Sequence, residues 1–343
     1  MSGAGPGAHP AARPCVLVFA GLDPSGGAGI AADLQAVAAQ GAHALTVATA
    51  LTVQDNDRVY AVRPVDPAML LRQAQALIDK MAISAVKIGI TGSAANALAI
   101  AEVIARLRER QPALPVVLDP VLASGHGDLL SRDDAVLALA PLLPLTTLLT
   151  PNGPEALALA SAHAHAHAGA GAGVGPATLL TPNGPEALAL AIAHAQAVTN
   201  ADAGVGVRAH NASPEALAQA LRARGCRHVL ITGGHGDGDE VINRWFGPGA
   251  GHGAAGRDVG APGAARSDAA AHDPGSPPEQ REWRWPRLAG EFHGSGCTLA
   301  SAIAAQLALG LPTAVALEQA QHYVYAALRD AYAVAPGQRI PLR

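Results

Sequence analysis

The sequence predicts an α/β fold in which helices cover both faces of a mostly parallel sheet. Short apolar runs alternate with helical patterns along most of the 343 residues, and this alternation is typical of parallel βαβ units. Glycine-rich segments lie where a strand ends or a helix begins. Ligands of such sheets bind at the carboxyl ends of the strands, so we expect the functional site at that edge.

The individual elements follow in chain order from the hydrophobic pattern. Apolar runs predict strands at residues 15–21, 43–52, 85–90, 115–119, 146–150 and 228–232. Helical spacing predicts helices at residues 29–40, 67–80, 94–110, 132–139, 213–224 and 299–309. The fifth of these helices starts at Ser213, a favoured N-cap residue that is followed by proline. Two further runs, 241–246 and 282–285, could pair as a hairpin.

Composition excludes several classes of protein. Half of the residues are hydrophobic, which suffices for a sizeable core, and we expect one domain over residues 15–335. The net charge is −4, whereas a nucleic-acid-binding protein usually carries an excess of basic residues. No apolar run is long enough for a membrane span. Residues 1–14 lack the apolar segment of a secretory signal and are expected to be a disordered tail. Three scattered cysteines, Cys15, Cys226 and Cys297, form no disulfide framework, which favours a cytoplasmic protein.

An internal duplication interrupts the alternation of strands and helices. Residues 147–160 and 178–191 are identical, TLLTPNGPEALALA. A single repeat does not make a solenoid, so we interpret it as a tandem duplication. The low-complexity segment between the copies, residues 161–177, contains alternating histidines that could bind a metal ion. No cysteine or acidic residue accompanies them, and we favour simple low complexity.

A second interruption covers residues 247–278. This segment is rich in Gly, Ala and Pro and shows no apolar periodicity. It separates the two runs of the expected hairpin. We therefore predict a disordered insert in a surface loop.

The most informative motif is the glycine-rich segment EFHGSGCT at residues 291–298, which runs directly into a helical pattern. The first N–H groups of a helix have no partner within the helix and carry partial positive charge. Glycines let a phosphate approach that backbone. Cys297 stands at the same helix start, where the pKa of a thiol tends to fall. The motif predicts phosphoryl transfer; the alternative is a glycine-rich turn before a core helix.

A second glycine-rich segment, AGLDPSGGAG at residues 20–29, follows the first strand and opens the first helix. It has neither the spacing of a dinucleotide fingerprint nor the lysine of a Walker A motif. It could let a small ligand approach the backbone. Asp33, one turn into the helix, and Gln54, at the end of the next strand, could bind the amino and ring-nitrogen groups of a heterocycle. The alternatives are a solvent-facing carboxylate for Asp33 and a turn residue for Gln54.

These motifs together resemble a known family. The segments AGLDPSGGAGIAADL, ALTVQDN, VKIGITGS, VVLDPVLASGHGDLL, LLTPNGPEAL, LITGGH and FHGSGCTLASAIAA are similar to those of hydroxymethylpyrimidine/phosphomethylpyrimidine kinases of thiamine biosynthesis. The matches keep the family order from about residue 15 to 330. The resemblance implies the ribokinase-like three-layer α/β/α sandwich. Sugar kinases of that superfamily generally carry Asp where this chain has Cys297.

The resemblance also implies an activity. The chain would use ATP and Mg²⁺ to phosphorylate 4-amino-5-hydroxymethyl-2-methylpyrimidine and then its monophosphate, as a cytoplasmic homodimer that binds neither nucleic acid nor membrane. A pyridoxal kinase of the same family is an alternative, because the same chemistry serves a different ring. An inactive relative that only binds a vitamin is another.

The resemblance assigns roles residue by residue. The backbone N–H groups of Gly294, Ser295 and Gly296 would hold the transferring phosphoryl group, and Cys297 would take the proton of the substrate hydroxyl. The pyrimidine pocket would be lined by Gln54, Ala28, Asp33 and Val121. The nucleotide would lie along Thr232 and Gly233. The Mg²⁺ ion would be organised by Asp119, Asn152 and Glu155.

The duplication offers two copies of the Asn-x-x-Glu motif, with Asn152 and Glu155 in the first copy and Asn183 and Glu186 in the second. Only one copy can occupy the strand end. The first follows Asp119 by 33 residues, which leaves room for one helix and one strand. We therefore expect the first copy to form the site, since an insert costs little where it loops out at the surface.

Overall fold

The computed structural model describes residues 12–128, 130–131, 133–166, 212–249 and 279–343. The strands are β1 (Cys15–Leu22), β2 (His43–Gln54), β3 (Val59–Pro64), β4 (Ile83–Ile88), β5 (Val116–Leu118), β6 (Leu148–Leu149), β7 (His228–Ile231), β8 (Glu240–Gly247) and β9 (Glu279–Pro286). The helices are α1 (Gly29–Ala39), α2 (Pro67–Ile78), α3 (Ala94–Arg110), α4 (Ala135–Leu139), α5 (Gly153–Ala166), α7 (Pro214–Ala223), α8 (Ser295–Ala308) and α9 (Thr313–Arg329).

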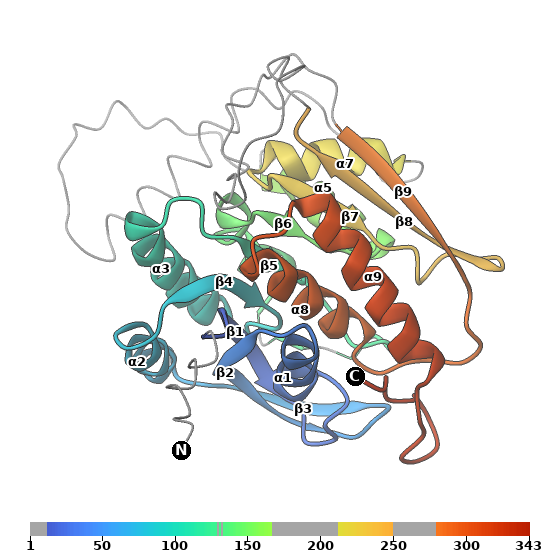
Figure 1. Ribbon diagram of the computed structural model, residues 1–343, viewed down its shortest axis with the longest axis horizontal. Coiled ribbons are helices and arrows are strands. Elements are labelled where there is room, and N and C mark those ends of the chain that lie inside the picture. Colours follow the sequence, from blue (N-terminus) through green and yellow to red (C-terminus); the bar gives the residue numbers. More distant parts are fainter. Residues whose placement is uncertain (1–11, 129, 132, 167–211, 250–278) are drawn as a thin grey trace, which may run out of the picture.

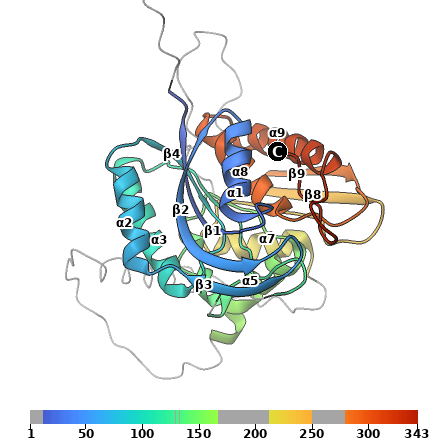
Figure 2. The same ribbon diagram turned by 90° about the horizontal axis from the view of Figure 1, so that it is seen from below.

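The strands form one sheet in the order β3-β2-β1-β4-β5-β6-β7-β8-β9. The pairs from β2 to β7 are parallel, whereas β3 at one edge and β8 and β9 at the other are antiparallel. One face packs against α2, α3, α4, α5 and α7, and the other against α1, α8 and α9 (Figures 1 and 2). The predicted three-layer α/β/α sandwich with a mostly parallel sheet is confirmed.

The strand sequences explain the two layers. Successive side chains of a strand point to opposite faces. In β1, Leu17 and Phe19 join the core under α2 and α3, while Val16 and Val18 join the core under α1 and α8. All four are fully buried. Burying such a side chain contributes roughly 1.5–3 kcal/mol, so an uninterrupted apolar run is what a sheet covered on both faces requires.

Polar N-caps fix where several helices begin. Asp66 accepts hydrogen bonds from the backbone N–H groups of Ala68 (3.0 Å) and Met69 (3.2 Å) at the start of α2. Ser213 accepts one from Ala216 (3.3 Å) at the start of α7, which confirms the predicted cap. At α4, Asp134 caps the helix in the same way. The helix predicted at 132–139 is therefore shorter and begins at Ala135.

Three of the named helices and strands, β3, α5 and α9, were not predicted from the sequence. Helix α5 lies over residues that were interpreted only as a repeated motif and the start of a low-complexity segment. The edge strand β3 pairs antiparallel with β2, and its six residues include three exposed ones, so its apolar signal is weak. Helix α9 packs on α8 and completes one helical layer. The expected hairpin is confirmed, because β8 and β9 pair antiparallel from Glu240 opposite Pro286 to Gly247 opposite Glu279.

The first copy of the duplication supplies β6 and the start of α5. Leu148 and Leu149 pair with both β5 and β7, so this copy fills the sheet. Residues 161–166, expected to be low-complexity, are the last residues of α5, and Gly247, expected to begin the insert, is the last residue of β8. The second copy, residues 167–177 and 250–278 of the two segments, and residues 1–11 of the expected tail lie outside the described residues.

None of the helices in the described ranges has the length and apolar character needed to span a lipid bilayer.

Candidate active site

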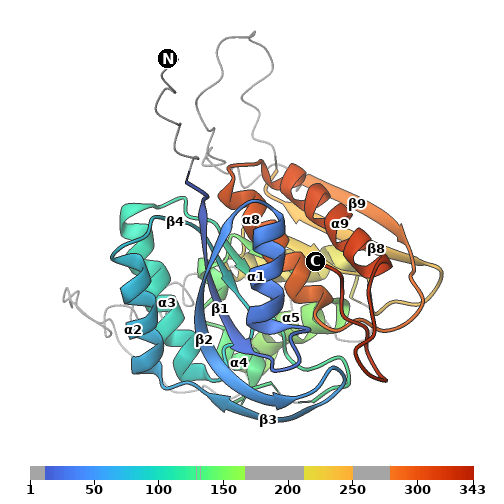
Figure 3. The same cartoon turned by 60° about the horizontal axis from the view of Figure 1, so that its bottom comes forward.

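A cavity of about 1020 Å³ lies at the carboxyl edge of the sheet. Its walls include residues at the ends of successive parallel strands: Gly21, Gln54, Gly89, Asp119, Thr150 and Thr232. The start of α8 closes one side, and Figure 3 shows α8 lying next to α1. This is the edge at which such sheets bind ligands.

The start of α8 offers unpaired backbone N–H groups. We call residues 293–297 the anion loop. Gly294 precedes the helix in the left-handed conformation, with φ 81°, and no side chain in the described part of the chain caps the helix. A side chain at position 294 would collide with the carbonyl oxygen of Gly27, so glycine is required. The N–H groups of the first turn are therefore free to bind an anion.

The anion loop is tied to the N-terminal glycine loop, residues 23–29. Oδ2 of Asp23 lies 2.8 Å from Nε2 of His293 and accepts a hydrogen bond from the N–H of Ala28 at 2.7 Å. Oδ1 accepts the N–H of Ser25 at 2.8 Å. Burial alone would raise the pKa of Asp23, but hydrogen bonds from His293, Ser25 and Gln54 lower it to about 2. One ionised carboxylate thus organises both loops.

Cys297 lies in the first turn of α8 and lines the cavity. Burial raises the pKa of its thiol to about 12, although the ammonium of Lys87 acts in the opposite direction. The prediction that the helix start lowers this pKa is wrong, because desolvation outweighs the helix charge. Cys297 is a protonated thiol here.

Lys87, which the sequence analysis did not single out, is fully buried at the centre of the site. Its Nζ lies 2.9 Å from Oδ1 of Asp33. Burial would lower the pKa of Lys87, but the carboxylates of Asp33 and Asp119 raise it above its ordinary value. The sequence signal was a charged residue inside the apolar strand β4, ISAVKI.

Asp33 does not line the cavity. Its carboxylate is fully buried, accepts a hydrogen bond from Oγ of Ser301 at 2.6 Å and pairs with Lys87. It is not the solvent-facing carboxylate of the alternative interpretation either. The remaining residues predicted to bind the substrate, Gln54, Ala28 and Val121, all line the cavity.

Asp119 follows β5 and faces the anion loop. A Cβ atom at Gly296 would lie 3.6 Å from both of its carboxylate oxygens. Burial and the charge of Asp33 raise the pKa of Asp119 to about 6, while Lys87 and the Cys297 thiol lower it. Within the described part of the chain, its buried Oδ2 atom has no hydrogen-bond partner. An oxygen of this kind is available to a hard cation such as Mg²⁺.

Asn152 and Glu155 form a capping box at the start of α5. The N–H of Asn152 donates to Oε2 of Glu155 at 2.9 Å, and the N–H of Glu155 donates to Oδ1 of Asn152 at 2.8 Å. Burial and the charge of Asp119 raise the pKa of Glu155 to about 7. Both side chains line the cavity but already serve the helix, so a Mg²⁺ ion would reach them best through bound water.

The residues expected beside the nucleotide lie at the end of β7. Thr232 lines the cavity, and its N–H donates to the carbonyl of Pro151 at 2.9 Å. Gly233 lies against β8, where any side chain would collide with the backbone of Ile242. Its N–H donates to Oδ1 of Asn243 at 3.0 Å. Asn243, which the sequence analysis did not single out, fixes this turn.

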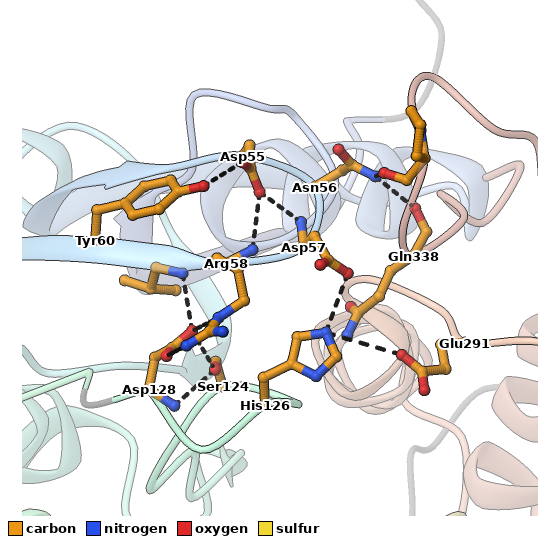
Figure 4. Close-up of polar contacts among 12 residues, drawn as sticks. Asp55, Asn56, Asp57, Arg58, Tyr60, Ser124, His126, Asp128, Glu291 and Gln338 are labelled. Atoms are coloured by element: carbon orange, nitrogen blue, oxygen red, sulfur yellow. Dashed lines mark hydrogen bonds and ion pairs between the residues drawn. The ribbon is translucent and has the colours of Figure 1, made fainter.

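Figure 4 shows polar contacts around Asp57 and Arg58, two residues that line the cavity. Nε of Arg58, in the turn after β2, donates to Oδ2 of Asp128 at 3.0 Å. Nε2 of His126 lies 3.0 Å from Oδ1 of Asp57. His126, Asp57 and Glu291 offer ligand atoms within 4.8 Å of one another, but they are partly or largely exposed and two of them already pair, so we assign no metal ion to them.

Comparison with known proteins identifies the family of this chain. The family model described as phosphomethylpyrimidine kinase matches residues 23–173 and 267–341, which is more than half of the chain. The chain therefore belongs to the phosphomethylpyrimidine kinase family.

Particular relatives agree with this. The hydroxymethylpyrimidine/phosphomethylpyrimidine kinase of Rhizobium meliloti is 30% identical over 94% of this chain and 93% of its own length. The thiamine biosynthesis bifunctional protein ThiED of Geobacter sulfurreducens is 30% identical over 96% of this chain, which spans 52% of that protein. The ADP complex of pyridoxal kinase from Staphylococcus aureus has the same fold, with a TM-score of 0.65, 21% identity and coverage of 96% of this chain and 93% of that one.

Proposed function

We propose that the protein transfers the γ-phosphoryl group of ATP to 4-amino-5-hydroxymethyl-2-methylpyrimidine and then to its monophosphate, a reaction sequence of thiamine biosynthesis. The observation that carries this proposal is the uncapped start of α8, where Cys297 lies against Asp119 inside one large cavity. Free N–H groups at that place stabilise the charge of a transferring phosphoryl group.

The pyrimidine would lie at the end of the cavity lined by Gln54, Ala28 and Val121. The amide of Gln54 has both a donor and acceptors, which suits an aminopyrimidine ring. ATP would lie at the other end, beside Thr232 and Gly233. The two substrates would then meet over the anion loop.

In the transfer step, the substrate hydroxyl oxygen forms a bond to the γ-phosphorus, the bond to the β-phosphate oxygen breaks, and ADP leaves. The hydroxyl proton passes to the sulfur of Cys297. Because Cys297 is a thiol in the free protein, it must give up its own proton, and the carboxylate of Asp119 beside it is the acceptor. This relay needs Asp119 to be ionised.

Asp119, Asn152 and Glu155 would organise a Mg²⁺ ion through bound water. When bound, it would neutralise phosphate charge. The unpartnered Oδ2 atom of Asp119 supports this assignment.

An acceptor panel tests the proposal. Purified protein with Mg-ATP is given the hydroxymethylpyrimidine, its monophosphate or pyridoxal, and ADP is followed by a coupled assay. We expect ADP from both pyrimidines. ADP from pyridoxal alone would favour a pyridoxal kinase, and ADP from none would favour an inactive vitamin-binding relative.

Three general properties complete the proposal. Residues 15–335 form a single kinase domain, two copies of the chain form a homodimer, and the protein works in the cytoplasm. The continuous sheet supports the first property, and the family resemblance supports the other two. Light scattering after gel filtration tests the dimer, which predicts twice the chain mass of 34.4 kDa; a single chain mass would contradict it.

A further inference from the structure

The guanidinium group of Arg343 connects the two glycine loops from behind. Its Nη2 donates to the carbonyl oxygen of Gly27 at 2.5 Å and lies 3.5 Å and 3.4 Å from the carbonyl oxygens of His293 and Gly294. Its Nε donates to Oγ1 of Thr298 at 2.8 Å. Figure 3 shows the end of the chain beside α1 and α8.

These contacts set the direction of the anion loop. In a trans peptide, the carbonyl of one residue and the N–H of the next point in opposite directions. Because the carbonyls of His293 and Gly294 face Arg343, the N–H groups of Gly294 and Ser295 face the other way. Both residues line the cavity, so these N–H groups are the ones available to a phosphoryl group.

The position of Arg343 is built into the backbone. The N–H of His293 donates to the carbonyl of Arg339 at 2.9 Å, and the N–H of Arg339 donates to the carbonyl of Glu291 at 2.9 Å. The N–H of Leu342 donates to Ala327 in α9 at 3.0 Å. The last segment thus runs along the anion loop and delivers Arg343 to it.

Arg343 also places positive charge behind the phosphoryl site. Burial lowers its pKa from the ordinary value, yet an arginine stays charged in proteins. Its buried Nη1 atom has no hydrogen-bond partner among the described residues. This part of the guanidinium group is therefore not engaged by a neighbouring acceptor there. A cation behind the N–H groups strengthens their attraction for an anion.

We propose that Arg343 is a positioning residue that orients the phosphoryl-binding N–H groups of Gly294 and Ser295. Arg343 lies beyond residues 23–173 and 267–341, which match the family model, so the inference comes from the geometry of this chain. It rests on the proposed phosphoryl transfer at the anion loop.

The test compares Arg343→Met and Arg343→Lys with Arg329→Met. Arg329 is exposed and pairs with its neighbour Asp330, so it serves as the control. Removing one such stabilising group lowers turnover by about 10²-fold. We expect that loss for Arg343→Met, a smaller one for Arg343→Lys, and unchanged KM for the pyrimidine. Added guanidinium should partly restore Arg343→Met.

A second measurement needs no acceptor. ADP with aluminium fluoride mimics the transferring phosphoryl group, and its affinity is compared with that of ADP alone. Arg343→Met should weaken the binding of ADP with aluminium fluoride by about the same factor as it lowers turnover. Its affinity for ADP alone should be unchanged. If the wild-type protein and Arg343→Met bind ADP with aluminium fluoride equally well, the proposal is overturned. It is also overturned if a loss of melting temperature in Arg343→Met and Arg343→Lys accounts for their loss of turnover. If the wild-type protein binds the mimic but phosphorylates no pyrimidine, the proposed acceptor is wrong while the role of Arg343 stands.

Discussion

Asp23 and His293 are 270 residues apart in the sequence, yet the carboxylate of one lies 2.8 Å from the imidazole of the other. This contact joins the N-terminal glycine loop to the anion loop. A ring atom of His293 also occupies the space where a side chain at Gly27 would lie. This partly buried contact, together with Arg343, therefore holds the substrate and phosphoryl sides of the cavity together.

Replacing Asp23 with Asn should disturb both stability and turnover. The depressed pKa of Asp23 means that its ionised form stabilises the fold above the unfolded value of 3.8, and that this contribution is lost as the pH falls toward about 2. The contribution is roughly 1–2 kcal/mol, since solvent screens part of it. Misplacing the anion loop should lower turnover about 10-fold or more. Urea unfolding at pH 7 and pH 2.5, with Asp330→Asn as the exposed control, checks this. A stability difference that persists unchanged at pH 2.5 would rule out the charge as its cause.

Cys297→Ala should lower turnover by about 10² or more, a typical loss for a general base, while ATP binding stays normal. Because the relay needs ionised Asp119, the turnover of the wild-type protein should fall as the pH drops through about 6. Turnover from pH 5 to 9 and ATP titration of the variant measure both effects. Undiminished turnover of Cys297→Ala would remove the residue from the reaction.

Glu155→Gln separates the two roles of this side chain. Glutamine can keep the capping box, because its amide oxygen still accepts the N–H of Asn152, but it loses the charge. We expect a near-normal melting temperature, a higher Mg²⁺ requirement and lower turnover. Glu186→Gln, in the second copy, is the matched control and should change little. If Glu186→Gln lowers turnover and Glu155→Gln does not, the metal belongs to the second copy. If both single variants have normal activity, the double variant is tested and should be inactive.

The insert should be removable. Gly247 and Glu279 are paired at the ends of β8 and β9, so a short turn suffices to connect them. Replacing residues 250–278 with a short Gly/Ser turn should preserve the melting temperature and kinase activity. A clear drop in melting temperature would show that the segment packs on the domain.

The sequence predicted the layers and the cavity edge, because apolar periodicity and glycine-rich strand ends are local signals. Most of the site residues that it named line the cavity. The sequence did not predict which side chains contact one another in the site. Lys87 was not singled out although it is a charged residue within an apolar strand, and its partner Asp33 lies 54 residues away. The role of Asp23 depends on a similar long-range contact with His293, 270 residues away. The sign of the Cys297 pKa shift was missed because burial beneath neighbouring elements cannot be read from the helix start alone.

The proposed function requires two successive phosphorylations of one hydroxymethylpyrimidine. Phosphorus NMR can follow the products while ADP is counted in the same sample. We expect 4-amino-5-hydroxymethyl-2-methylpyrimidine to be converted first to a monoester and then to a diphosphate, with two ADP formed per pyrimidine. Cys297→Ala should make neither product at a comparable rate. No phosphorylated pyrimidine from the folded wild-type protein with Mg-ATP would contradict the proposed function.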